Sequence, residues 1–291
     1  MRYNKFSDYL KSKYGEKVYK LPVNIPVSCP NRDGKISDRG CIFCGEEGAG
    51  FELLPNSKSV DKQLYRNAAY IGKRYNAKKF IAYFQNFSNT YVEPEKFRKY
   101  LYDVCGTDLD IVEIYISTRP DCVTDEHIII MNDVKKIYGK NVLVELGLQS
   151  VNEETLRFLN RGHTVKDFDN AVKRLKSMGI EVCAHFITDI PTDSDEDIVQ
   201  GAKHISSLNV DQVKCHSLYV LKDTELGRMY EAGEFVPLTT DDFKRRTILF
   251  LENLSQDIIV QRIIGRAPKE RTLYCNGGRS WWKIQEEIEE E

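Results

Sequence analysis

The chain has 291 residues, 41% of them apolar and 30% charged, and a formal net charge of −2 at pH 7. This composition excludes a disordered or collagen-like chain, supports one large hydrophobic core and leaves no global attraction to nucleic acid. No apolar run approaches the ~20 residues that a membrane span requires, and no apolar stretch follows the first five residues as in a signal peptide, so we expect a cytoplasmic protein.

Apolar and β-branched runs alternate with segments of helical period along the first 216 residues. Strands are predicted at 21–27, 79–84, 111–117, 141–148, 180–187 and 211–216. Helices are predicted between them at 58–76, 94–105, 124–138, 152–159, 165–178 and 194–207. This alternation predicts an α/β fold with a parallel sheet and right-handed crossovers. Six βα units favour a partial (β/α)6 barrel, and a doubly wound open sheet is the alternative that alternation alone leaves open.

The regular alternation ends near His216. Beyond it we predict a helix at 240–253, a strand at 257–262 and a Gly-rich loop at 274–280. We therefore divide the chain into a core with an N-terminal extension, residues 1–216, and a small C-terminal extension, residues 217–291. The C-terminal extension is expected to close the open side of the barrel.

Three cysteines lie in a loop after the first predicted strand with the spacing C-x11-C-x2-C: Cys29, Cys41 and Cys44. Eight cysteines are too few for a disulfide scaffold at this length, so clustered thiols are expected to be ligands or catalysts. Three thiolates can hold three irons of a 4Fe-4S cluster and leave the fourth iron without a protein ligand. The alternative is structural zinc, which needs four ligands, and the nearby sequence offers neither a histidine nor a second C-x2-C pair. Phe43 suits a cluster loop, where an aromatic ring can shield iron or cover an adenine.

Polar residues close several of the predicted strands. Cofactors of parallel α/β barrels bind at the carboxyl ends of the strands, so these side chains are expected around one mouth. They are Gln85, Ser117, Arg119, Gln149, His185 and His216. The alternative for each is a group that only satisfies nearby backbone, since buried polar groups need hydrogen-bond partners in any protein.

Several short motifs together resemble a known family. They are the cysteine motif with its long first gap, YFQN at 83–86, STRPDC at 117–122, ELGLQS at 145–150, NRGHT at 160–164 and KCHSLY at 214–219. The chain resembles the radical S-adenosylmethionine (SAM) superfamily, and within it the branch related to the Elongator catalytic subunit that includes the bacterial YhcC/YtqA-type proteins.

The resemblance implies an enzyme in which SAM binds the open iron of a 4Fe-4S cluster. An electron from a donor that the sequence does not identify then cleaves SAM and gives a 5'-deoxyadenosyl radical. By the family pattern, Gln149 holds the ribose, Arg161 pairs with the methionine carboxylate and His185 contacts the second ribose hydroxyl. The ligand of the SAM amino group stays open among Gln85, Ser117 and Glu145.

The segment 262–283 is basic and aromatic. It contains Arg262, Arg266, Lys269, Arg271, Arg279 and Lys283 against Glu270 alone, with Tyr274, Trp281 and Trp282 among them. Such a segment either reads a single-stranded RNA loop or forms a lid whose aromatics pack on the barrel.

The family resemblance implies tRNA as the partner, with modification of the C5 side chain of the wobble uridine. The alternatives are a radical SAM enzyme that acts on a small metabolite or cofactor, and a non-catalytic, metal-bearing RNA-binding module.

Overall fold

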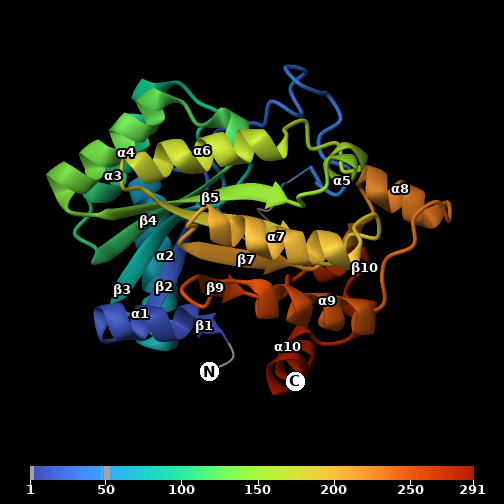
Figure 1. Cartoon of the computed structure of the whole chain (residues 1–291). Coiled ribbons are helices and arrows are strands. Elements are labelled where there is room, and N and C mark those ends of the chain that lie inside the picture. Colours follow the sequence, from blue (N-terminus) through green and yellow to red (C-terminus); the bar gives the residue numbers. More distant parts are fainter. Residues whose placement is uncertain (1–2, 47, 49–52) are drawn as a thin grey trace.

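A computed structural model describes residues 3–46, 48 and 53–291 of the chain, and Figure 1 shows it as a curled sheet with helices on its outer side. The main sheet has eight strands in the order β1-β9-β7-β6-β5-β4-β3-β2, and all of them pair in parallel. Their bounds are β1 Asn4–Lys5, β2 Val18–Val23, β3 Lys79–Phe84, β4 Ile111–Thr118, β5 Asn141–Gln149, β6 Glu181–Ile187, β7 Gln212–His216 and β9 Ile259–Arg262. A separate antiparallel pair joins β8 (Val220–Leu221) to β10 (Thr272–Tyr274).

The six predicted βα units are present, in chain order, from β2 to β7. Because the strand order never reverses along this part of the sheet, the sheet has no topological switch point, and the fold is a partial barrel rather than a doubly wound sheet. The helices are α1 Phe6–Tyr14, α2 Val60–Tyr75, α3 Pro94–Cys105, α4 Asp125–Tyr138, α5 Glu153–Phe158, α6 Val165–Ser177, α7 Asp195–Ser207, α8 Glu225–Glu231, α9 Thr240–Asn253 and α10 Trp281–Glu290. None of them, within the described part of the chain, has the length and apolar character needed to cross a bilayer.

Local sequence signals explain where the outer helices begin. Thr124, Thr164 and Ser194 precede α4, α6 and α7, and each forms a capping box with the residue three positions on. Such a box satisfies backbone N–H groups that the first helical turn leaves without partners, and so fixes the helix start. The starts of these three helices differ by no more than one residue from the sequence prediction.

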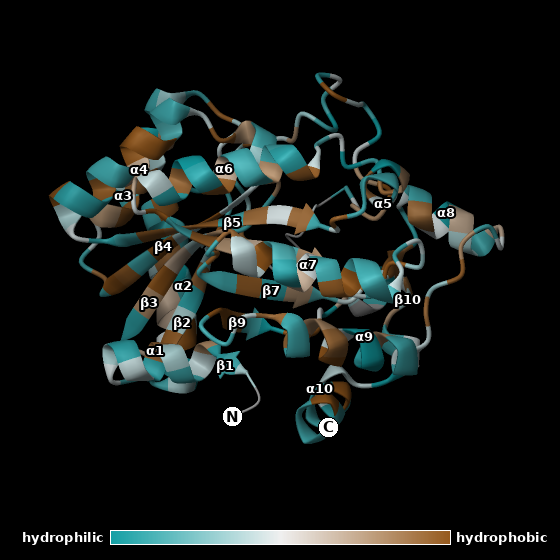
Figure 2. Cartoon of the chain, viewed as in Figure 1, coloured by the Kyte–Doolittle hydropathy of each residue, from teal (hydrophilic) through white to brown (hydrophobic). Residues whose placement is uncertain are grey.

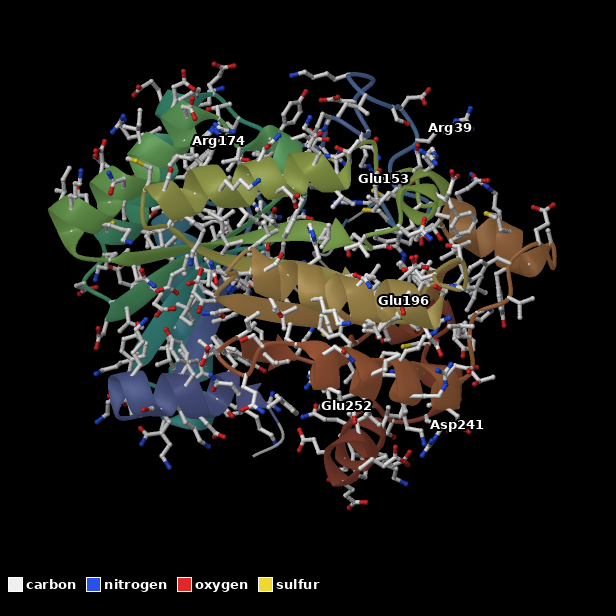
Figure 3. The ribbon with its side chains drawn as sticks, in the orientation of Figure 1. Arg39, Glu153, Arg174, Glu196, Asp241 and Glu252 are labelled. Carbon is white, nitrogen blue, oxygen red and sulfur yellow. The ribbon has the colours of Figure 1, made fainter. Side chains whose placement is uncertain are left out.

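The core lies between the sheet and the helix layer. In Figure 2 the helices carry alternating teal and brown bands, whereas β3 and β4 are mostly brown. This is the pattern of amphipathic helices that cover parallel strands buried on both faces. The charged side chains of Arg39, Glu196 and Asp241 are on the outer surface (Figure 3).

The strand predicted at 21–27 is β2, and the structure places it at Val18–Val23. The side chain of Gln63 explains why it ends there, because Gln63 accepts from the Asn24 backbone N–H at 2.9 Å and donates to the Asn24 carbonyl at 2.7 Å. These contacts occupy the N–H and C=O groups of Asn24 that would otherwise pair with β3 and extend the strand. Pro22 is tolerated because β2 is an edge strand of the sheet.

The C-terminal extension contributes to the sheet itself. The predicted strand at 257–262 is β9, which inserts between β7 and β1, and the helix predicted at 240–253 is α9. The extension therefore continues the curled sheet beyond β7.

Candidate active site

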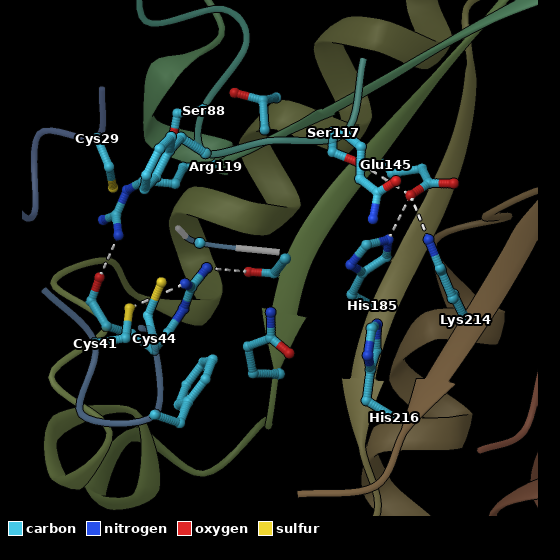
Figure 4. A pocket seen from close by; sticks show the side chains of 18 of the residues that line it. Cys29, Cys41, Cys44, Ser88, Ser117, Arg119, Glu145, His185, Lys214 and His216 are labelled. Carbon is cyan, nitrogen blue, oxygen red and sulfur yellow. Dashed lines mark hydrogen bonds and ion pairs between the residues drawn. The ribbon is translucent and has the colours of Figure 1, made fainter. Parts of the chain in front are cut away.

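A cavity of about 200 Å³ opens at the carboxyl ends of β3 to β7, where the cysteine loop covers it. Figure 4 shows the cysteines on one side of this cavity and Glu145, His185 and Lys214 on the other. The ten residues singled out from the sequence as ligands all line it: Cys29, Cys41, Phe43, Cys44, Gln85, Ser117, Glu145, Gln149, Arg161 and His185.

The cysteine loop has no helix or strand and is held by specific polar contacts. The Asn31 side chain donates to the Asn160 carbonyl at 2.6 Å, and the Asn160 side chain donates to the Gly40 carbonyl at 2.6 Å. Gly162, at φ +66°, allows this close approach, because a Cβ there would lie 2.8 Å from Asn31 Oδ1. These contacts fix the loop to the segment between α5 and α6.

Two arginines point at the loop sulfurs. Arg161 Nη1 lies 3.3 Å from Cys41 Sγ, and Arg32 Nη1 lies 3.7 Å from Cys44 Sγ while it donates to the Gly45 carbonyl at 2.8 Å. Burial raises the pKa of Cys44 to about 11, and the neighbouring Cys41 adds to the rise. A thiolate at this position therefore needs more positive charge than Arg32 supplies, such as a bound metal would provide.

The three loop sulfurs are not placed as the ligands of one metal ion. Thiolates on one tetrahedral zinc lie roughly 4 Å apart, because each Zn–S bond is about 2.3 Å. Among the described residues, the group of three potential ligands whose atoms all lie within 4.8 Å of one another is Glu145, Cys183 and His185, not the three loop cysteines. As placed, the loop thiols are therefore too far apart to bind one zinc ion together.

Arg161 is a buried cation without a carboxylate partner among the described residues. It is 7% exposed, and its guanidinium donates to the Gly147 carbonyl at 3.0 Å and to His163 Nε2 at 3.1 Å. Burial, with Arg161 beside it, lowers the pKa of His163 to about 2, so this histidine is neutral. The charge of Arg161 is thus left for an anionic ligand in the cavity.

The end of β5 has an unusual backbone. The register of β5 against β6 shifts between Gly147 and Gln149, and Gln149 has a φ of +75°. This left-handed conformation is uncommon for a residue with a side chain, and such strain often occurs at functional sites. Gly147 makes room here, because a Cβ on it would lie 2.8 Å from Gln149 Nε2.

Glu145 lies at the centre of a buried network at the other end of the cavity. One of its oxygens contacts Lys20 Nζ at 3.0 Å. The other accepts from Tyr83, Ser117, His185 and Lys214 at 2.7 to 3.0 Å. Although burial opposes ionisation, Lys20 and Lys214 hold the pKa of Glu145 well below its usual range. The hydrogen-bonding capacity of this carboxylate is therefore taken up by protein groups.

The same end of the cavity contains more basic groups. Burial lowers the pKa of Lys214 to about 8 and that of His185 to about 4. Arg262 lies 2.6 Å from His216 Nδ1, and burial followed by the charge of Arg262 lowers the pKa of that histidine well below its usual range. The cavity thus combines a sulfur-rich side with a polar, cationic side.

Sequence reasoning missed Lys20, Tyr83, Lys214 and Arg262 as members of the site. A signal was present in β7, where Gln212, Lys214 and His216 alternate with apolar residues. A period of two places these polar side chains on one face of the strand, toward the interior of the barrel.

Comparison with known families agrees with this geometry. Residues 28–205 match the model of the radical SAM superfamily, and residues 210–291 match the radical SAM C-terminal domain. The chain belongs to the radical SAM superfamily. Its members are enzymes that bind a 4Fe-4S cluster and SAM, and the resemblance inferred from the motifs is confirmed.

Individual relatives support the same placement. The uncharacterized protein YtqA of Bacillus subtilis is 32% identical over 291 residues, which are 100% of this chain and 89% of that protein. A tRNA uridine(34) acetyltransferase of Methanocaldococcus infernus is 34% identical over 134 residues, 45% of this chain and 24% of that protein. The solved structure of Elp3 from M. infernus has a TM-score of 0.69 at 21% identity, covering 94% of this chain and 63% of that one. That likeness concerns the fold alone.

Proposed function

We propose that Cys29, Cys41 and Cys44 hold a 4Fe-4S cluster and that this radical SAM enzyme modifies the C5 side chain of the wobble uridine in tRNA. The observation that carries the cofactor assignment is the cavity itself, where three dispersed thiols lie beside a buried arginine that lacks an acidic partner. When bound, the cluster and SAM supply the 5'-deoxyadenosyl radical that abstracts hydrogen from substrate.

The residues of the chain bind and orient SAM. Arg161 forks onto the methionine carboxylate, because its guanidinium is buried and its nearest partners are neutral or sulfur. Gln149 is aimed into the cavity by its left-handed backbone and holds the ribose, with His185 at the second hydroxyl. Phe43 covers the adenine beside the cysteines.

The SAM amino group is assigned to the region of Gln85 and Ser117. Glu145, the third candidate, already contacts five protein groups and is fully buried. Ser117 donates to Glu145 and keeps lone pairs that can accept a hydrogen bond, and Gln85 lines the cavity nearby.

The tRNA assignment is supported by relatives and by charge. A tRNA uridine(34) acetyltransferase matches 45% of this chain, and the basic and aromatic segment at 262–283 begins at the cavity residue Arg262. Cations that neutralise phosphates, together with aromatics that stack on bases, are typical of single-stranded RNA recognition. A small metabolite is the competing substrate.

Anaerobic reconstitution tests the cofactor assignment. We expect about four irons and four sulfides per chain, and 5'-deoxyadenosine from SAM after reduction. Cys41→Ala should abolish both, while Cys105→Ala, which removes a cysteine on α3 outside the cavity, should change neither. Zinc in place of iron, with SAM left intact, would overturn the assignment.

The substrate assignment has its own test. Nucleosides of tRNA from a strain that lacks this protein should show an altered wobble uridine, restored by the parental chain but not by Cys41→Ala. An unaltered wobble uridine in that strain, with SAM cleavage intact in vitro, would favour the small-metabolite alternative.

A further inference from the structure

A second hollow lies in the C-terminal extension. This groove has a volume of about 640 Å³, larger than the central cavity. It is formed by the segment after β9, by β10, by the turn Asn276–Gly278 and by the first residues of α10. It is open rather than enclosed, and its size and position fit part of an extended polymer.

Aromatic rings line one wall of the groove. Trp282 is 45% exposed, and the Lys283 ammonium lies 5.4 Å from the centre of its ring. Trp281 packs against the core and carries the Arg266 guanidinium 3.8 Å above its ring centre. The stack holds Arg266 at the rim, and the exposed ring of Trp282 is left for a planar ligand.

The two charged residues that line the groove, Arg266 and Arg279, are both cations. Arg266 and Lys283 form no ion pair with the described residues, whereas Arg279 pairs with Glu287. The chain as a whole is slightly acidic, so this local excess of cations is a feature of the groove. Unpaired cations beside an exposed aromatic ring complement a phosphate next to a base.

The groove is connected to the central cavity along the chain. Arg262 lines the cavity and Arg266 lines the groove, four residues further along the chain. Strand β10 also pairs with β8, which follows β7 along the chain, and β10 lies near the carboxyl end of β7 in Figure 1. Beside this pair, Arg271 forms an ion pair with Asp223, whose carboxylate would lie 3.1 Å from a Cβ on Gly45 of the cysteine loop.

We propose that this groove binds a nucleotide of single-stranded RNA that flanks the nucleotide in the central cavity. Its base stacks on Trp282, and its phosphate pairs with Arg266 and Lys283. The inference rests on the proposed tRNA function and adds to it a place where the enzyme holds the neighbouring residue of the anticodon loop. Binding the neighbour outside the barrel lets the target base leave the stack and enter the cavity.

Trp281 and Trp282 are the only tryptophans in the chain, so intrinsic fluorescence reports on the groove directly. In Trp281→Phe, the remaining fluorophore is Trp282, and a seven-nucleotide anticodon-loop RNA should quench its emission. Trp282→Ala should weaken binding of the same RNA, measured by anisotropy, by about fivefold or more, because base stacking is worth at least ~1 kcal/mol. Tyr70→Ala, which removes an exposed aromatic on α2, is the matched control and should bind as the parent does.

A second variant tests the phosphate contact. Lys283→Gln should lower the slope of log affinity against log salt by about one. Unquenched Trp282 emission, or full RNA affinity in Trp282→Ala, would overturn the proposal that the groove binds RNA, even if the parent modifies the wobble uridine. If the parent cleaves SAM but neither binds nor alters tRNA, the proposed function fails together with the groove.

Discussion

Glu145→Gln should destabilise the protein by about 3–5 kcal/mol, the usual cost of removing one partner from a buried ion pair. The substitution keeps the shape of the side chain but removes the charge that faces Lys20 and Lys214. Lys214 is buried among the strands, so its ammonium would lose the attraction that offsets its desolvation. The loss is a large fraction of the 5–15 kcal/mol that stabilises a typical domain.

Urea unfolding of the cofactor-free protein at pH 7 measures this free energy. Glu154→Gln is the control, because Glu154 forms an ion pair with Arg157 with 81% of its side chain exposed, and its loss should cost less than about 1 kcal/mol. Adding Lys214→Met to Glu145→Gln should recover part of the stability, since one buried charge is then removed. A cost for Glu145→Gln no larger than that of Glu154→Gln would refute the reasoning.

Three further substitutions test other parts of the structure. Burial raises the pKa of Asp189 to about 7, so the native state binds the extra proton between about pH 4 and 7 and parental stability falls as the pH rises through that window. Asp189→Asn should remove this fall, a difference of roughly 2–3 kcal/mol between pH 5 and pH 8 in urea titrations. In the cluster-loaded protein, Arg32→Gln should lower the midpoint potential of the cluster in a redox titration, because the guanidinium beside a ligand sulfur favours the more negative reduced state. The control is Arg39→Gln, on the exposed side of the same loop, which should leave this potential unchanged. Gly201→Ala should cost about 1–3 kcal/mol despite its better helix propensity, since the new Cβ would lie 2.4 Å from the Phe186 ring, and a rise in melting temperature would contradict this packing.

The repeating part of the fold could be predicted from the sequence because its signals are local. Buried parallel strands give continuous apolar runs, and their helices begin at capping residues such as Thr164 and Ser194. The observed position of β2 differs from the prediction because the end of this strand depends on Gln63, a residue about forty positions away. The insertion of β9 beside β7 is equally non-local. The sequence of this segment predicts that it is a strand, but it does not predict which strand it pairs with.

The candidate site also combines residues that sequence patterns reveal with residues that only the fold brings together. The sulfur side was predicted because the cysteine spacing and the polar ends of the strands are visible along the chain. On the cationic side, Glu145, His185 and His216 were predicted but Lys20 and Arg262 were not, because these two come from strands that meet only through the curl of the sheet. A lysine within a strand is usually a surface residue, and the carboxylate of Glu145 favours its burial here.

The pairing of β1 with β9 joins residues that are separated by about 255 positions, Asn4 with Ile259 and Lys5 with Val260. During synthesis β1 therefore has no partner until β9 has emerged, and the free edge of β7 stays open for the same time. An open strand edge is a site for intermolecular pairing, so the nascent protein is most exposed to aggregation just before its last strand arrives. The pairing of β9 with both β7 and β1 then completes the main sheet.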